Sequence, residues 1–432
     1  MGKTVIARGA LLLVPGILCT FMSTPVGAEV QTLSLPQTIE YSLKNNGDLK
    51  SFREEKGIRD AGKVKAGLLP NPTLEFEGGT GALTGSSAEN NLSFGVSQEF
   101  LLAGKRKKRL ATAERELEMY RWQLAERERV LRGEVKSAFY DLILARKRLA
   151  LSESFISLNR QLFAVTKERL TAGDIPELEM NLVKVELARS IGKKTEIDKA
   201  LKQNQTKLWT FMGLPFVEHP AITDNLEAEI PLTKTLADLK RLAYERRPDI
   251  KAIQAEKSRG ESEIILAQAE GIPNLTAGLA IKYDATSMEV GGMEGKDKAY
   301  TLGLKLSMPI PLFDRNQAAV REARAKRNSA ESRLSAATTA VEREVETAYA
   351  GFVNTGNILA MYRTDILPQL EENLKLTQEA YRLGEVGILT VIEEQKKFFE
   401  VNDGYLAALH DRQMALVNLE TAVATDLTGG EK

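Results

Sequence analysis

Residues 91–100, NLSFGVSQEF, alternate apolar side chains with small or polar ones, which is the period of a β-strand with two unlike faces. Residues 73–81, 274–284 and 299–308 follow the same alternation. The sequence therefore predicts four strands in two pairs, each strand with one apolar face and one face of small or charged residues. The apolar positions are Leu74, Phe76, Leu92, Phe94, Val96, Phe100, Leu275, Ala277, Leu279, Ile281, Tyr283, Tyr300, Leu302, Leu304 and Leu306.

Each of these stretches is close to the roughly 9 to 11 residues that a tilted strand needs to cross a bilayer. Apolar residues outside and polar residues inside suit strands between lipid and water. A half-buried sheet of a soluble protein has the same period, so the alternation alone leaves both interpretations open. After the N-terminal segment, the longest uncharged run is residues 347–362, which is short and contains Asn354 and Asn357. If the chain meets a membrane, its strands must do so.

The number of strands then predicts an assembly. Strands in a membrane close into a barrel without a free edge, and barrels need about eight strands or more. Four strands per chain are too few, so we expect at least two chains, and with three chains a shared barrel of twelve strands. The connections at residues 82–90 and 284–298 are polar and glycine-rich, as expected for surface loops. Met288 and Met293 in the second are interpreted as ordinary loop residues.

The two halves of the chain repeat one another in a fixed order, which indicates duplicated architecture. Residues 35–49 align with residues 236–250, placing Asp48 on Asp249, and further along Gly173 aligns with Gly384. The expected organisation is a signal peptide at 1–28, a first repeat at 29–215 with its strand hairpin near 73–100 and its helical hairpin near 105–212, a linker at 216–235, and a second repeat at 236–428 with its strand hairpin near 274–308 and its helical hairpin near 314–426.

Most of the remaining sequence is typical of long helices. Leu110, Leu117, Leu124 and Leu131 recur every seven residues, which predicts a coiled-coil seam. Each helical run extends over roughly 70 residues, or about 100 Å at the helical rise. Helices of this length form a wall or a stalk and not a catalytic core. The corresponding seam of the second half is Val341, Val345, Ala348, Phe352, Thr355, Leu359, Tyr362, Ile366 and Leu370.

Two turns interrupt the helical runs at matched places. In RLTAGDIP, residues 169–176, Gly173 follows a helix and Pro176 precedes the next one, and in YRLGEVG, residues 381–387, Gly384 and Gly387 stand in similar positions. A glycine at a helix end and a proline at a helix start are typical of a sharp reversal. Such a tip, far from the strands, is a candidate docking surface.

The N-terminus predicts export. Lys3 and Arg8 precede an uncharged stretch that ends in VGA at residues 26–28, as in a signal peptide cleaved after Ala28. A retained anchor, and a lipid on Cys19, are the alternatives, but Leu18 stands where a lipoprotein signal has a small residue. Cleavage leaves no cysteine, and 57 basic residues against 59 acidic ones. This composition argues against disulfides, a catalytic thiol and a nucleic-acid surface.

With this layout the chain resembles the TolC family of outer-membrane efflux ducts over essentially all of its mature length. Residues 309–317, PIPLFDRNQ, resemble most the heavy-metal (CzcC/CusC-like) branch of that family, although FLL at 100–102 lacks the matching proline elbow. The resemblance implies an α+β membrane protein: a homotrimer with a twelve-stranded barrel in the outer membrane above a periplasmic tunnel of antiparallel coiled-coil helices. It also implies a passive duct for an inner-membrane pump and a periplasmic adaptor, with heavy-metal cations as cargo.

The same resemblance implies two groups of site residues. Gly173, Gly384 and Gly387 fall at the tips that face the adaptor. The periplasmic gate and aperture positions are Glu179, Tyr381, Thr390 and Glu393. Of the two acidic positions that ring the aperture in the family, only Glu393 is acidic here. Val386 stands where the family has the basic partner of the acidic gate residue, so what holds the gate closed is an open question at this point.

Nothing in the sequence predicts an enzyme. The two histidines, His219 and His410, show no metal-ligand spacing, and no phosphate-binding glycine loop is present. We therefore expect no catalytic residue, cofactor or metal site, and energy for transport must come from partner proteins. Drug efflux and type I secretion are alternative roles for the same duct. An alternative of another class is a soluble periplasmic adaptor built from coiled-coil hairpins.

Overall fold

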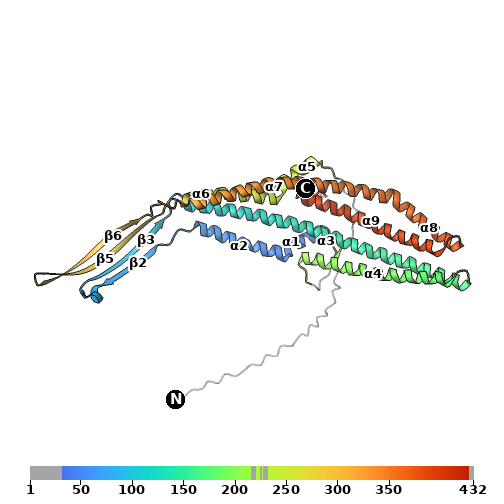
Figure 1. Ribbon diagram of the computed structural model, residues 1–432, viewed down its shortest axis with the longest axis horizontal. Helices are drawn as coiled ribbons and strands as arrows, with labels where there is room; N and C mark the ends of the chain where they lie inside the picture. Colours follow the sequence, from blue (N-terminus) through green and yellow to red (C-terminus); the bar gives the residue numbers. More distant parts are fainter. Residues whose placement is uncertain (1–31, 216–219, 224–225, 227–231, 428–432) are drawn as a thin grey trace, which may run out of the picture.

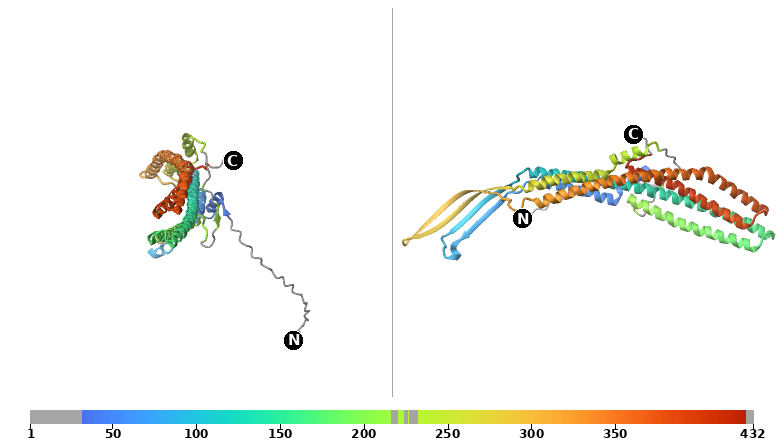
Figure 2. Two further views of the ribbon diagram at one scale, coloured as in Figure 1. Left: turned by 90° about the vertical axis from the view of Figure 1, so that its right-hand side faces the viewer. Right: turned by 45° about the horizontal axis from the view of Figure 1, so that its top comes forward.

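The computed structural model describes residues 32–215, 220–223, 226 and 232–427. The expected signal peptide, Cys19 and His219 lie outside the described residues. The molecule is long and narrow, with a β-sheet at one end and the turns of two helical hairpins at the other (Figure 1). Seen along its length, the helices form a curved wall and not a closed bundle (Figure 2).

In each half of the chain, two helices are followed by two strands and then by long helices. The first half contains β1 (Thr32–Leu33), α1 (Leu35–Asn45), α2 (Gly47–Gly67), β2 (Thr73–Thr80), a 3₁₀ turn (Gly81–Thr84), β3 (Asn90–Phe100), α3 (Lys105–Ala172), α4 (Glu177–Met212) and β4 (Ala221–Ile222). The second half contains α5 (Leu236–Arg246), α6 (Pro248–Glu270), β5 (Leu275–Val290), β6 (Met293–Ser307), α7 (Gln317–Met361), a π-helical turn (Tyr362–Ile366), α8 (Leu367–Leu383) and α9 (Ile388–Val423).

Strands β2, β3, β5 and β6 form one antiparallel sheet in that order. The register places Phe94 beside Phe76 on one side and Ile281 on the other, so the predicted apolar positions share a face. This face is bare: Phe76 is 71% exposed and Leu302 is 74% exposed, and the sheet projects beyond the helices (Figure 1). A half-buried soluble sheet packs its apolar face against another layer, and no described helix covers this one.

The opposite face of the sheet is polar. Glu75 accepts a hydrogen bond from the hydroxyl of Ser97 at 2.9 Å, and Lys305 Nζ lies 3.2 Å from its other carboxylate oxygen. Glu75 is on β2 and Lys305 on β6, so the pair spans the sheet from edge to edge. Gly95 and Gly278 lie between them, and the absence of side chains at these two positions keeps the path open.

The predicted loop at residues 284–298 was wrong, because β5 and β6 continue through it. The two strands are joined by only Gly291 and Gly292, whose φ angles are 62° and 82°. A two-residue hairpin turn whose twist matches the strands needs positive φ at both positions, which glycine adopts without strain. The glycine-rich composition therefore indicates a tight turn and not a long loop.

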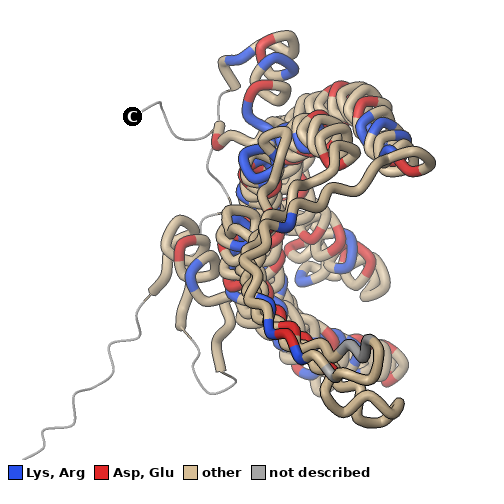
Figure 3. The backbone as a smooth tube through the Cα atoms, turned by 90° about the vertical axis from the view of Figure 1, so that its left-hand side faces the viewer, with Lys and Arg blue, Asp and Glu red and all other residues tan. Residues whose placement is uncertain are grey.

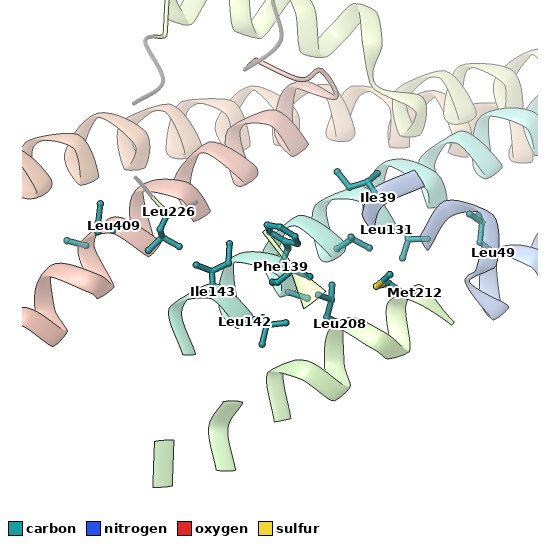
Figure 4. Close-up of a cluster of buried hydrophobic side chains, with 14 of the residues drawn as sticks. Ile39, Leu49, Leu131, Phe139, Leu142, Ile143, Leu208, Met212, Leu226 and Leu409 are labelled. Atoms are coloured by element: carbon teal, nitrogen blue, oxygen red, sulfur yellow. The ribbon is translucent and has the colours of Figure 1, made fainter. Parts of the chain in front are cut away.

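The long helices pack through the predicted apolar positions. Helix α3 spans 68 residues and buries Leu117 and Leu131, while α7 and α8 are separated by the π-helical turn just before Pro368. Proline cannot donate to the residue four positions earlier and its ring collides there, which accounts for this interruption. The largest core lies midway along the molecule, where α1, α3, α4 and α9 meet (Figure 4). Its members include Ile39, Leu49, Leu131, Phe139, Leu142, Ile143, Leu208, Met212, Leu226 and Leu409.

Candidate functional site

The two hairpin turns at the end opposite the sheet have nearly the same backbone. Gly173 has φ 80° and ψ 12°, and Gly384 has φ 81° and ψ 13°. The following amides close each helix: Asp174 N–H donates to Arg169 O at 2.9 Å, and Glu385 N–H donates to Ala380 O at 2.9 Å. This closing motif needs a left-handed residue, which explains both glycines.

Gly387 differs from these two glycines. It precedes α9 with φ −84° and ψ 162°, an extended conformation that any residue adopts. Pro176 precedes α4 with φ −75° and ψ 154°. The two residues therefore start their helices in the same way, and the expectation that Gly387 supplies a special turn geometry is not supported by its backbone.

An apolar cluster joins the two hairpins close to these turns. Tyr381 lies at its centre with 2% of its surface exposed. The cluster takes side chains from α3 and α4 of the first hairpin and from α8 and α9 of the second. Its buried members are Leu162, Val183, Tyr381, Ile388, Val391 and Ile392, and Val386 packs against them. The position that the family resemblance would give to a basic residue is therefore part of an apolar contact.

The structure brings together Glu179 and Tyr381, two of the proposed gate residues. The hydroxyl of Tyr381 lies 3.4 Å from Oε2 of Glu179 and 3.4 Å from Oγ1 of Thr166. Thr166 is fully buried and donates to the carbonyl oxygen of Leu162 at 2.8 Å. Glu179 stands in the first turn of α4, and Tyr381 stands in the last turn of α8. Their contact therefore links the first hairpin to the second.

Thr390 and Glu393 lie outside this contact. Both are exposed, whereas Val391 and Ile392 between them are buried. The helical period turns positions 390 and 393 to one side of α9 and the apolar positions to the other. These two residues thus occupy a free face of the tip and not the junction between the hairpins.

Two residues of the junction, Thr166 and Arg169, were not predicted from the sequence. Arg169 Nη1 donates to the main-chain oxygen of Tyr381 at 3.0 Å, and its guanidinium lies 4.7 Å from the centre of the Tyr381 ring. A basic residue in the last turn of a helix usually complements that helix's own end. Its position in the sequence gave no sign that Arg169 turns instead to the end of the other hairpin.

None of the helices in the described part of the chain combines the length and the apolar content needed to cross a membrane. Within residues 32–215, 220–223, 226 and 232–427, no group of three or more histidine, cysteine, aspartate or glutamate side chains is placed to hold a metal ion.

A bare apolar sheet joined to long helical hairpins with matched tips suits an elongated channel-type membrane protein. The family model for the outer membrane efflux protein matches residues 39–214 and 239–425, and the chain belongs to that family. It is therefore an outer-membrane efflux channel of a non-enzymatic transport family, and it is not an enzyme.

Individual relatives cover nearly the whole chain at low identity. The cobalt-zinc-cadmium resistance protein CzcC of Cupriavidus metallidurans is 22% identical over 393 residues, covering 90% of this chain and 89% of the relative. The pyoverdine export outer membrane protein OpmQ of Pseudomonas putida is 21% identical over 406 residues, covering 90% and 84%. A crystal structure of CusC superposes with a TM-score of 0.74 at 18% identity, covering 90% and 91%, which shows the shared fold.

Proposed function

We propose that this protein is the exit duct of a tripartite efflux system. Three copies share a twelve-stranded barrel in the outer membrane, and their helices form a periplasmic tunnel. The duct passively conducts heavy-metal cations delivered by an inner-membrane pump through a periplasmic adaptor. An N-terminal signal peptide, cleaved after Ala28, exports the chain.

The observation that carries this proposal is the sheet with two unlike faces. Its apolar face is bare and its polar face holds the Glu75–Lys305 pair. Strands β2 and β6 stand at the two edges of the sheet, and in lipid each edge must be paired. Strands that alternate in direction allow β6 of one copy to pair with β2 of the next, so that three copies close the ring.

We also infer that the chain is an internal duplication. Five backbone features recur at offsets of 201 to 212 residues. They are the helix starts at Ser34 and Thr235, the helix breaks at Asn46 and Arg247, the left-handed residues Gly104 and Asn316 before the long helices, the tip glycines Gly173 and Gly384, and the left-handed helix ends Gly213 and Ala424. The two matches of the family model, one in each half, support the same inference.

The tips and the junction between them take the proposed periplasmic roles. Gly173, Gly384 and Gly387 mark the surface that meets the adaptor. Glu179 and Tyr381 belong to the periplasmic gate, because their contact joins the two hairpins. Thr390 and Glu393, on the free face of α9, line the aperture. A carboxylate at the aperture raises the local concentration of cations.

The cargo is the part of the proposal that rests on relatives alone. CzcC is named for cobalt, zinc and cadmium resistance, whereas OpmQ is named for pyoverdine export. We propose metal cations because residues 309–317 also resemble that branch. The test is to express this gene in a strain from which the efflux duct has been deleted. Restored growth in the presence of cobalt, zinc or cadmium supports this cargo. Restored export of a drug or a secreted protein without metal resistance would assign the duct to the alternative roles.

The channel itself is tested by planar-bilayer conductance of the purified mature protein together with its oligomeric mass. Discrete, cation-preferring channels from a trimer that fractionates with the outer membrane are expected. A water-soluble protein recovered from the periplasmic extract, with no conductance, would support the soluble adaptor in place of the duct.

A further inference from the structure

Arg169, in the last turn of α3, reaches the last turn of α8. Its Nη1 donates to the main-chain oxygen of Tyr381 at 3.0 Å, which also accepts the N–H of Gly384 at 3.1 Å. A side chain built at position 384 would place its Cβ 3.8 Å from Nη2 of Arg169. The C-terminal end of a helix carries partial negative charge and favours a cation. Arg169 therefore caps the end of α8 from the other hairpin.

The bond lengths rank the polar contacts at this junction. The two contacts of the Tyr381 hydroxyl are both 3.4 Å, long for O–H···O bonds, which centre on about 2.7–2.8 Å. Thr166 donates its hydroxyl proton to Leu162 O. The Tyr381 hydroxyl has one proton, so it can donate to Thr166 or to Glu179 but not fully to both. The Arg169 bond is charge-assisted and of ordinary length, which makes it the stronger contact.

We propose that Arg169 is the basic member of the latch that holds the tip closed. It supplies from α3 the positive charge that is missing at Val386, and it acts on Tyr381 as a positioning residue through the ring and the carbonyl oxygen. This inference rests on the proposed function, since it assigns a role within the proposed gate. Glu179 then serves as a second, weaker tie on the same tyrosine.

Arg382 offers a matched control for the experiment. It also stands in the last turn of α8, but its side chain is 68% exposed and its ion pair, at 3.7 Å, is with Glu379 of its own helix. We expect Arg169→Ala to raise the open probability in planar bilayers roughly tenfold, since it removes a charge-assisted bond. Arg382→Ala should leave it unchanged, and Arg169→Lys should give an intermediate value, because lysine keeps the charge without the planar stack.

A second measurement does not depend on conductance. Hydrogen exchange of the main-chain amides at residues 381–385, in the intact detergent-solubilised protein, should accelerate in Arg169→Ala and not in Arg382→Ala. Unchanged exchange in Arg169→Ala, or conducting channels whose open probability rises equally in both alanine variants, would overturn the latch. If no variant conducts while Arg169→Ala alone loses amide protection, the channel proposal fails and the link between the hairpins stands.

Discussion

Lys136 is a buried cation held between two carboxylates on the C-terminal segment. Its Nζ lies 2.8 Å from Glu420 and also contacts Asp426. Lys136→Met leaves the carboxylate of Glu420 buried without its partner, and breaking a buried pair in this way costs about 3–5 kcal/mol of unfolding free energy. Chemical denaturation in detergent measures this loss. The double variant Lys136→Met/Glu420→Gln removes both charges and should recover most of it; no recovery would contradict an ion-pair origin.

The pH dependence of that contribution has a definite sign. Burial acts to lower the pKa of Lys136, but Glu420 and Asp426 outweigh it and raise the pKa above its ordinary value. A raised pKa means that the stabilisation is complete below the unfolded value of about 10.4 and is lost as pH rises through the folded value. We expect the stability difference between wild type and Lys136→Met to be constant from neutral pH to about pH 9 and to shrink only in strong alkali. A difference that shrinks below pH 9 would contradict this account.

Glu393 carries the proposed cation preference of the aperture. Its side chain is exposed on the face of α9 opposite the apolar cluster, so Glu393→Lys changes charge without disturbing packing. Three lysines in a trimer should lower the cation-to-anion permeability ratio measured from reversal potentials. Glu177→Lys, at an exposed position in the first turn of α4, is the charge-matched control. An equal effect of both variants on the permeability ratio would contradict the placement of Glu393 at the aperture.

At the level of elements, the backbone at Gly384 accepts fewer residue types than the backbone at Gly387. Proline fixes φ near −65° and has no N–H, whereas Gly384 has φ 81° and donates to Tyr381 O. Gly384→Pro should therefore abolish export-dependent resistance while leaving the trimer intact, because the sheet and the core midway along the molecule lie far from this turn (Figure 1). Gly387→Ala, at φ −84°, should retain resistance. Full resistance in Gly384→Pro, measured in a deletion strain, would contradict a functional role for this turn.

The elements themselves were predictable where one local pattern decides them. Alternation defined which residues of β3 share a face, and glycine after a long heptad run marked the end of α3 at Gly173. The composition of residues 284–298 predicted a loop, which was wrong. Gly291 and Gly292 make a tight turn there between strands that continue through a polar segment. Arg169 was not predictable, since its contact joins positions 212 residues apart, and no local pattern encodes the approach of two hairpins.

At the scale of the whole molecule, the distribution of charge and the curved shape are those expected of one subunit of a larger ring. Basic and acidic residues are interspersed along the helices, with no large region of one sign (Figure 3). The buried guanidinium of Arg247, at the start of α6, lies 2.7 Å from Glu344 on α7, which links neighbouring helices of the curved wall. In contrast, both edges of the sheet and its apolar face have no partner within the described chain. The unsatisfied surfaces thus concentrate at the end proposed to lie in the membrane.

The sheet permits a test with two adjacent residues. Leu302 lies on the apolar face and Thr301 on the polar one, and both are exposed in the single chain. If the apolar face contacts lipid, Leu302→Arg costs about 2–4 kcal/mol near the bilayer midplane, and Thr301→Arg faces water and costs little. The fraction of heat-modifiable trimer recovered from outer membranes should fall for Leu302→Arg and stay near the wild-type level for Thr301→Arg. In a soluble protein both arginines would reach solvent, so equal recovery of the two variants would place this sheet outside the membrane.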